Sequence, residues 1–173
     1  SLELLKFLVN ETEADLLKFN KEGYSTLCFA ISEHSSKDII EFLMAKNREL
    51  QRLHDMYNYS DTAFHIAAQH KNVEAIKWLA KFEKEDSYFN GATFMLNRDH
   101  QLALHIAASS GDIMTTQAML EVTDDYLLNR QDKYGRTALH YACIAMSWQF
   151  VQILLQKDNV RVDIHDSIIG NTA

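Results

Sequence analysis

Histidines are the residues of this sequence that most directly suggest chemistry, because imidazole binds metal ions and transfers protons. The chain has 173 residues and eight histidines, and three of them, His65, His105 and His140, stand in similar segments. Their spacing indicates one position repeated in separate helices, which pack about 8–10 Å apart. Because zinc–nitrogen bonds are only about 2.0–2.1 Å long, the three rings cannot meet on one ion. We therefore predict no metal and no cofactor.

The two cysteines, Cys28 and Cys143, are the candidate nucleophiles. A reactive thiol requires an exposed, electropositive setting. Cys143 stands where two similar segments have Ala68 and Ala108, so we expect it in the core, and we expect Cys28 to pack as a small hydrophobic residue. No Cys-x-x-Cys pair, glycine-rich phosphate loop or Gly-x-Ser-x-Gly turn is present. Two cysteines cannot form a disulfide-rich scaffold, which favours a reducing compartment.

Paired carboxylates can perform acid–base catalysis, and this chain has two clusters, at Asp124–Asp125 and from Glu83 to Asp86. Both fall between apolar helical segments, where a solvated surface is the simpler interpretation. We therefore predict that the chain is not an enzyme.

The elements that would position these residues are repeated along the chain. Four short segments align with one another, and a fifth begins at Thr172. The four are 25–31, 62–68, 102–108 and 137–143. A second apolar stretch with helical periodicity follows each of them. Helices this short are not stable alone, so each turn–helix–loop–helix unit must stack on its neighbours to bury its apolar faces.

The segment Asp132-Lys-Tyr-Gly135-Arg-Thr137-Ala-Leu-His140-Tyr-Ala resembles the ankyrin repeat, whose signature is Thr-Pro-Leu-His-x-Ala-Ala after Asp-x-x-Gly-x. This chain has no proline, and alanine occupies the proline position in most units. The resemblance covers almost the whole chain. It implies an all-α ankyrin-repeat solenoid of stacked helix–loop–helix units joined by hairpin-like turns. It also implies that the motif histidines are buried and bonded to backbone.

A single ankyrin-repeat domain is therefore expected over 1–173. Its predicted parts are the end of a preceding repeat at 1–19, repeats at 20–56, 57–96, 97–131 and 132–166, and a truncated repeat at 167–173. The second repeat contains a predicted inserted loop at 83–95, which is acidic and aromatic. Because the last unit stops inside its motif, we expect the natural protein to continue.

Glycines support this organisation independently of the resemblance. Gly23, Gly135 and Gly170 each stand two residues before the Ser/Thr position, where a tight turn requires positive φ. Repeat three departs from the pattern, because His100 takes the glycine position and Leu102 the threonine position. Loss of that N-cap is expected to cost roughly 0.5–2 kcal/mol.

Net charge excludes several classes of partner. Lys and Arg number 17 against 24 Asp and Glu, giving −7, which argues against nucleic acid and against anionic lipid. No apolar run is long enough for a membrane span. The opening residues have neither the basic region nor the apolar region of a signal peptide, so we expect none. We expect a cytoplasmic location.

A stack of this kind presents an extended concave surface. By the resemblance, that surface comes from the turn tips and the exposed sides of the first helices. The partner-binding residues placed there are Tyr24, Glu33, Tyr59, Asp61, Gln69, His70, Gln101, Tyr134, Arg136 and Ile144. Tyrosines are enriched in protein interfaces, so Tyr24, Tyr59 and Tyr134 are the expected anchors. The alternative is that they only cover the neighbouring turn. Trp148, at a helix junction, is either boundary packing or a binding residue.

These features predict a monomeric protein–protein interaction module that binds a protein or peptide partner on its concave face and takes no small-molecule substrate. The excess of carboxylates favours a partner with a basic surface. One alternative is a target-recognition arm of a larger bacterial effector, enzyme or channel, and another is a structural spacer. The composition, rich in Asn, Lys, Ile, Phe and Tyr, resembles ankyrin proteins that intracellular bacteria secrete into the host cytosol. A eukaryotic scaffold is the alternative origin.

Overall fold

The computed structural model describes residues 2–11, 15–16, 18–46, 61–85, 92–168 and 170–173. Within these ranges the regular elements are helices, and no β-strand occurs. In chain order they are α1 (Leu2–Glu11), α2 (Thr26–Ser32), α3 (Lys37–Lys46), α4 (Ala63–Gln69), α5 (Val73–Glu85), η3 (Ala92–Phe94), α6 (Ala103–Ser109), α7 (Ile113–Val122), η4 (Asp125–Leu127), α8 (Ala138–Ile144) and α9 (Trp148–Leu155).

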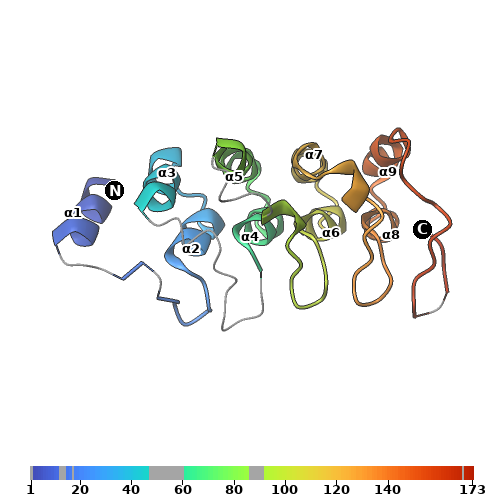
Figure 1. The fold of residues 1–173 in the computed structure, drawn as a ribbon, viewed down its shortest axis with the longest axis horizontal. Helices are drawn as coiled ribbons and strands as arrows, with labels where there is room; N and C mark the ends of the chain where they lie inside the picture. Colours follow the sequence, from blue (N-terminus) through green and yellow to red (C-terminus); the bar gives the residue numbers. More distant parts are fainter. Residues whose placement is uncertain (1, 12–14, 17, 47–60, 86–91, 169) are drawn as a thin grey trace.

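The helices form two rows, as Figure 1 shows. The inner row contains α2, α4, α6 and α8, and the outer row contains α3, α5, α7 and α9, with α1 beside α3 at the N-terminal end. Each inner helix packs against the next inner helix and against the outer helix that follows it. Hairpin-like turns, which we call fingers, extend from the inner row on one side of the stack. This arrangement confirms the predicted all-α solenoid.

The core lies between neighbouring helix pairs. The leucine position of the motif is buried in every unit, as Leu27, Phe64, Leu104 and Leu139. Alanines from successive inner helices are also fully buried, and their small side chains let the helices approach closely. Because every unit buries one face on each neighbour, the short inner helices are stabilised by stacking rather than by their own length.

The start of each inner helix shows how the motif histidine works. Ser25 caps α2 by accepting a hydrogen bond from the Cys28 N–H at 3.2 Å. At α4 the Thr62 N–H donates to His65 Nδ1 at 3.1 Å. Leu102 has no hydroxyl, yet its N–H donates in the same way to His105 Nδ1 at 3.0 Å. The histidine therefore satisfies this backbone donor even where the predicted hydroxyl cap is missing.

Backbone dihedrals confirm the glycine predictions. Gly23, Gly135 and Gly170 have φ values of 85°, 75° and 70°. His100, which occupies the glycine position of the third unit, also takes a positive φ of 58°. The third unit thus keeps the turn geometry, although histidine adopts a positive φ less readily than glycine does.

The sequence predictions for Cys143 and for the loop at 83–95 need correction. Cys143 was expected in the core, but it is exposed. Ala68 and Ala108, at the same position, are buried because another helix pair packs over them, whereas no described helix pair packs over α8 and α9. The predicted inserted loop at 83–95 begins later than expected, because α5 continues through Glu85 and keeps 83–85 helical. Residues 86–91 lie outside the described part of the chain.

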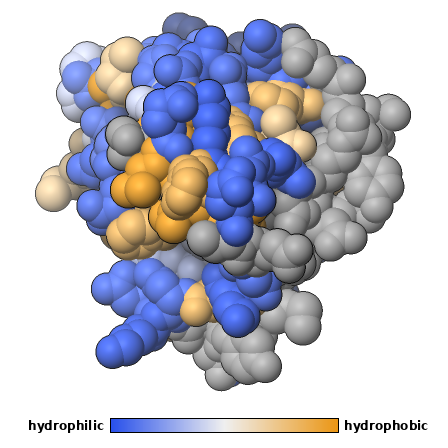
Figure 2. Space-filling view, turned by 90° about the vertical axis from the view of Figure 1, so that its left-hand side faces the viewer, coloured by the Kyte–Doolittle hydropathy of each residue, from blue (hydrophilic) through white to orange (hydrophobic). Residues whose placement is uncertain are grey.

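The α1 end of the stack carries an apolar patch, visible in Figure 2. Its large exposed side chains include Leu4, Phe7 and Leu8 of α1. Among the described residues, no helix combines the length and hydrophobicity that crossing a bilayer requires.

Candidate interaction surface

The fingers are the first part of the candidate surface, and hydrogen bonds hold neighbouring fingers in register. The Lys133 N–H donates to the Asp99 carbonyl at 2.9 Å, and the Ser167 N–H donates to the Tyr134 carbonyl at 2.8 Å. Further along the row, the Asn97 amide donates to Asp61 Oδ1 at 2.9 Å. The described fingers at 97–101, 132–136 and 166–170 are therefore bonded to one another, and Asp61 links the first of them to the second unit.

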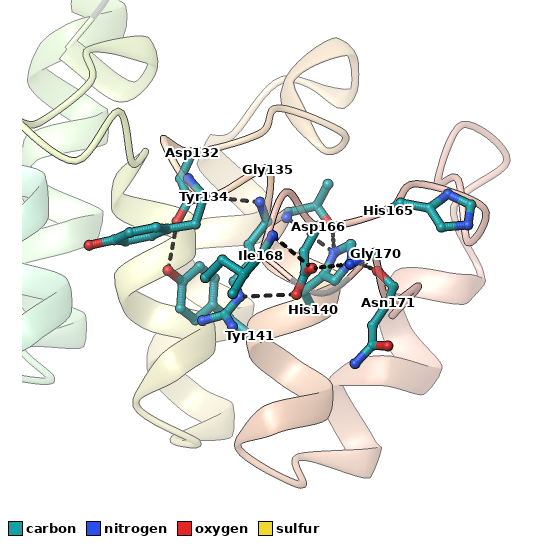
Figure 3. A network of polar contacts seen from close by, with 12 residues as sticks. Asp132, Tyr134, Gly135, His140, Tyr141, His165, Asp166, Ile168, Gly170 and Asn171 are labelled. Carbon is teal, nitrogen blue, oxygen red and sulfur yellow. Dashed lines mark hydrogen bonds and ion pairs between the residues drawn. The ribbon is translucent and has the colours of Figure 1, made fainter.

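Each described finger is shaped by one Asn or Asp side chain. Asp132 Oδ1 accepts from the N–H groups of Tyr134 and Arg136 at 2.8 and 2.9 Å. Asp166 Oδ1 makes the equivalent bonds to Ile168 and Gly170 in the last finger, and both sets are drawn in Figure 3. Asn20 and Asn97 bond in the same pattern. This local bonding explains why an Asn or Asp residue precedes these four described turns.

The motif histidines connect each inner helix to the turn that follows. The Nε2 atom of His65 lies 2.9 Å from the Gln101 carbonyl oxygen, that of His105 lies 2.9 Å from the Arg130 carbonyl, and that of His140 lies 3.3 Å from the Asn171 carbonyl. Because Nδ1 accepts a backbone N–H at the start of the helix, Nε2 must carry the proton and donate. Both ring nitrogens are thus used in the stack. The described residues contain no group of side chains suited to holding a metal ion.

A polar network joins the third and fourth units below the fingers, and Figure 3 shows the part of it formed by Tyr141 and Asp132. The Tyr141 hydroxyl donates to Asp132 Oδ2 at 2.6 Å, and the Gln101 amide donates to the same hydroxyl at 2.9 Å. Burial and the nearby carboxylate raise the pKa of Tyr141 to about 12. Burial would raise the pKa of Asp132, but hydrogen bonds from Tyr141 and from the finger N–H groups outweigh it and lower that pKa. The carboxylate therefore stays ionised as a structural acceptor.

Comparison with known proteins agrees with this architecture. The family model described as "Ankyrin repeats (3 copies)" matches residues 1–89, 27–127 and 85–166. The chain belongs to the ankyrin-repeat family. The matched ranges do not give the number of individual repeats in this chain. The predicted number of four repeats and the predicted origin from a bacterial effector therefore stay predictions.

Two named relatives share this ankyrin region. Human transient receptor potential cation channel subfamily A member 1 is 28% identical over 196 aligned residues, covering 95% of this chain and 17% of the channel. Rabankyrin-5 from mouse and from human is 36% and 35% identical over 69 residues, covering 40% of this chain and 6% of each relative. The chain thus spans only a small part of the length of these relatives.

The structure places the predicted partner-binding residues of the ankyrin stack in different settings. Glu33, Gln69, Tyr134 and Ile144 are exposed, and Tyr24, Asp61, His70 and Arg136 are half-buried. Gln101 was expected at an exposed turn tip but is buried, since its amide bonds to Tyr141 inside the stack. Tyr59 lies outside the described residues.

Tyr24 and Tyr134 make different contacts. The Tyr24 hydroxyl lies 3.5 Å from His70 Nε2, and the two rings meet edge to face with centroids 6.2 Å apart. Tyr24 therefore covers the end of the next inner helix. Tyr134 keeps 37% of its surface exposed, and the Lys133 ammonium lies 4.8 Å from its ring centroid. Tyr134 is thus the more accessible aromatic side chain of the described fingers.

Charges along the ankyrin fingers have both signs. Lys133 forms an ion pair with Asp99 at 2.6 Å, and Arg136 Nε lies 3.6 Å from Asp166 Oδ2 of the next finger. Arg136 therefore serves partly as a link between fingers. Carboxylates also gather on the other side, where Glu83, Glu121 and Asp124 help line a cavity of about 410 Å³ together with Lys84.

Several exposed apolar residues were not included among the predicted site residues. Phe29 on α2 is 46% exposed, Met146 is 85% exposed and Trp148 is 62% exposed. Phe29 occupies the variable position between the histidine position and the following alanine of the motif. Ile66, at the same position of the second unit, is buried, so no feature of the sequence indicates that Phe29 is exposed. Met146 could have been noticed, because the equivalent positions hold His34, Lys71 and Gly111.

Proposed function

We propose that this ankyrin stack is a protein-binding module whose partner lies across the fingers and the exposed sides of the inner helices, the concave face expected from the sequence. Ankyrin repeats are generally protein-interaction modules. The observation that carries the proposal is the set of bonded fingers from the third unit onward, which holds Tyr134 at a fixed position, while Glu33 and Gln69 are exposed at the ends of the inner helices α2 and α4. A preorganised surface loses little conformational entropy on binding.

The partner's charge follows from the same surface. Glu33, at the C-cap of the inner helix α2, is an exposed carboxylate that forms no ion pair with the other described residues, and the net charge is −7. A partner with basic residues would complement this charge.

A second candidate function is a recognition arm of a larger protein. The relation to a human cation channel covers 95% of this chain but only 17% of the channel. An arm would bind its target in the same way, while the activity would belong to other parts of the polypeptide. Binding by the isolated chain is common to both candidates, whereas a functional readout in the longer protein would be specific to the second.

We further infer that the described residues do not form an enzyme active site. The three motif histidines use both ring nitrogens in structural bonds. Partial burial raises the pKa of the Cys143 thiol, which disfavours the nucleophilic thiolate.

The experiment is affinity capture with three baits: the unchanged chain, Tyr134→Ala, and Tyr126→Ala. Tyr126 is a matched control because it is 70% exposed but lies in η4, after the outer helix α7. A partner retained by the unchanged chain and by Tyr126→Ala, but reduced roughly tenfold or more by Tyr134→Ala, would support binding at the fingers.

Two results would contradict the proposal. Equal loss with Tyr126→Ala would place the partner on the other side of the stack. If all three baits retained the partner equally, Tyr134 and the finger that carries it would not contribute to the interface. Circular dichroism of each bait checks that the variants remain folded.

A further inference from the structure

A cavity of about 410 Å³ opens on the outer side of the stack, between the second and third units. Its walls are the end of α5, the helix η3, and the end of α7 with the two residues that follow it. This volume is in the range of pockets that hold small ligands. Helix pairs of the first and fourth units lie on either side of these two units (Figure 1), so a further unit at either end of the stack would not cover the opening. We call this site the α5–α7 cavity.

Carboxylates dominate the charge of the α5–α7 cavity. Glu83, Glu121 and Asp124 line it, together with one cation, Lys84. Glu83 Oε1 already accepts the Thr93 N–H at 3.4 Å. Glu121 and Asp124 are exposed and form no ion pair with any residue that the structure describes. The cavity therefore has an excess of negative charge, and two of its carboxylates are not used in the fold.

The end of α7 adds backbone acceptors to these carboxylates. Its last turn contains no basic residue, although the C-terminus of a helix favours a nearby cation. The C-cap residue Thr123 has an extended backbone, with φ −95° and ψ 128°, and its hydroxyl donates to the Met119 carbonyl at 2.7 Å. Within the described part of the chain, no backbone N–H donates to the carbonyls of residues 120–122. These carbonyls need donors from outside the helix.

Thr93 contributes a buried polar group to the same wall. It lines the cavity although only 5% of its surface is exposed. Its hydroxyl forms no hydrogen bond with the described residues. Among those residues, only Arg136 Nε is fully enclosed without a partner, so the Thr93 hydroxyl keeps a small accessible surface at the cavity. Buried polar groups nearly always have a hydrogen-bond partner, which indicates that a ligand supplies one here.

The next junction of the stack shows how such carboxylates are neutralised within the fold. Between the third and fourth units, the Lys157 ammonium lies 3.1 Å from Asp125 Oδ1. Val122 is the equivalent of Lys157, because both stand at the same distance from the first residue of their outer helices. Val122 lines the α5–α7 cavity. The junction between the second and third units therefore lacks the lysine that the following unit provides at the next junction.

We propose that the α5–α7 cavity binds the side chain of an arginine from a partner protein. A guanidinium is always charged and carries a planar set of N–H donors, which suits the carboxylates of Glu121 and Asp124 and the Thr93 hydroxyl. Phe94 lines the same cavity and is 43% exposed, and guanidinium groups stack on aromatic rings. A lysine ammonium has fewer donors and no plane to stack. This contact goes beyond the proposed function, because it lies on the outer row of helices and not at the fingers.

The test uses N-acetyl-argininamide, which has the side chain and the blocked ends of an arginine residue inside a polypeptide. The isotope-labelled full chain is titrated with it, and NMR spectra follow the backbone amide signals of Thr93, Thr123 and Asp124. We expect saturable shifts of these signals with a dissociation constant on the order of 1 mM, as for other ligands of this size. N-acetyl-lysinamide should bind at least roughly threefold more weakly.

Two variants test the assignment from opposite directions. Glu121→Gln combined with Asp124→Asn keeps the shape of both side chains but removes their charge, so the dissociation constant should rise at least roughly tenfold. Val122→Lys places an ammonium at the cavity wall, as Lys157 does at the next junction, and should weaken binding of N-acetyl-argininamide by a similar factor. Both effects would be absent if the ligand bound elsewhere on the stack.

Asp38→Asn combined with Asp158→Asn is the matched control. Both residues are exposed acids away from the cavity, one on α3 and one after α9, and the net charge changes by the same amount as in the cavity variant. The control should leave the dissociation constant unchanged. An unchanged dissociation constant in Glu121→Gln with Asp124→Asn, or no saturable shift in the unchanged chain, would overturn the proposal. Thermal unfolding of each variant checks that it remains folded.

Other occupants give different results. If free arginine bound at least roughly tenfold more tightly than N-acetyl-argininamide, a small molecule would replace the partner protein as the ligand. If calcium ions shifted the same signals at micromolar concentration, a metal ion would replace it. Either result would overturn the proposal. The affinity capture with Tyr134→Ala tests the fingers independently, so failure at the cavity and failure of the proposed function are distinguishable.

Discussion

The Tyr141 hydroxyl lies 2.6 Å from Asp132 Oδ2 and donates a hydrogen bond to it. This bond joins the inner helix α8 to the base of its own finger, and the Gln101 amide extends it to the preceding unit. The same carboxylate orders the finger that carries Tyr134 through its other oxygen. The position of the finger and the packing of the helix are therefore coupled through one side chain.

Tyr141→Phe should lower the free energy of unfolding by about 1–3 kcal/mol, because it leaves Asp132 Oδ2 and the Gln101 amide with one partner fewer in a largely buried site. Urea unfolding followed by circular dichroism measures the change. Tyr126→Phe is the control, since Tyr126 is 70% exposed, and it should have no effect. If Tyr141→Phe were as stable as the unchanged chain, the hydrogen bonds of the Tyr141 hydroxyl would contribute nothing to the free energy of unfolding.

Stability should depend on pH through His105. Burial lowers the pKa of this histidine below its ordinary value of 6.5, although the bond to the Arg130 carbonyl opposes the shift. The unfolded chain therefore binds a proton at a higher pH than the folded one does. The stabilisation is complete above about pH 6.5 and decreases as the pH falls from there toward the lower folded-state pKa.

Urea unfolding at several pH values between neutral and acidic conditions measures this dependence. His105→Gln should reduce the slope of stability against pH in this window, whatever it does to stability at neutral pH. His100→Gln, at an exposed turn position, is the control and should keep the slope. An unchanged slope in His105→Gln would assign the pH dependence to other groups.

The repeat pattern was sufficient to predict the helix pairs and the positive φ at the glycine turns, because both depend on local residue types recurring in each unit. It also predicted that Cys28 is buried, and the structure confirms this with 2% exposure. Cys143 was predicted wrongly by the same logic, since burial at its position depends on a following helix pair and not on the residue itself.

Contacts between units could not be predicted from the pattern. Gln101 and Tyr141 stand at variable positions of their motifs, and only the stacked geometry brings them 2.9 Å apart. The exposure of Met146 and Trp148 is likewise a property of the assembled stack. The family signature describes what the units share, whereas the candidate surface is built from the positions in which they differ.

Gly135→Ala should destabilise the chain more than Gly170→Ala, although both glycines have positive φ. A Cβ on Gly135 would clash with the Ser167 side chain and lie 2.7 Å from the Ser167 nitrogen, whereas a Cβ on Gly170 would meet nothing within 4 Å. Gly170→Ala should therefore show only the conformational cost of about 1 kcal/mol, and Gly135→Ala clearly more.

Thermal and urea unfolding of the two variants, measured side by side, give the difference. Because the clash is with the next finger, Gly135→Ala should also loosen the Tyr134–Ser167 backbone bond, which amide hydrogen exchange at Ser167 would detect. Equal stability of the two variants would mean that the last finger moves away without cost.

Asn72 should matter more than its counterpart Asp112. The Asn72 side chain accepts from the Ala75 N–H at 3.0 Å, which caps α5, and donates to the Ile31 carbonyl of the preceding unit at 2.9 Å. Asp112 caps α7 through the Thr115 N–H at 2.8 Å. Both alanine variants lose a cap worth about 1 kcal/mol. Asn72→Ala also removes this donor from the Ile31 carbonyl, which keeps the His34 N–H at 3.1 Å, so the lost bond adds about 0.5–1.5 kcal/mol.

Asn72→Asp separates the two roles of this side chain, because aspartate can still cap α5 but cannot donate to Ile31. Urea unfolding should place it below the unchanged chain, with part of the loss seen in Asn72→Ala. Asp112→Asn, which keeps the cap at the equivalent position, is the control and should change stability little. If Asn72→Asp were as stable as the unchanged chain, the bond to Ile31 would contribute nothing, and the stacking of the first two units would depend on apolar contacts alone.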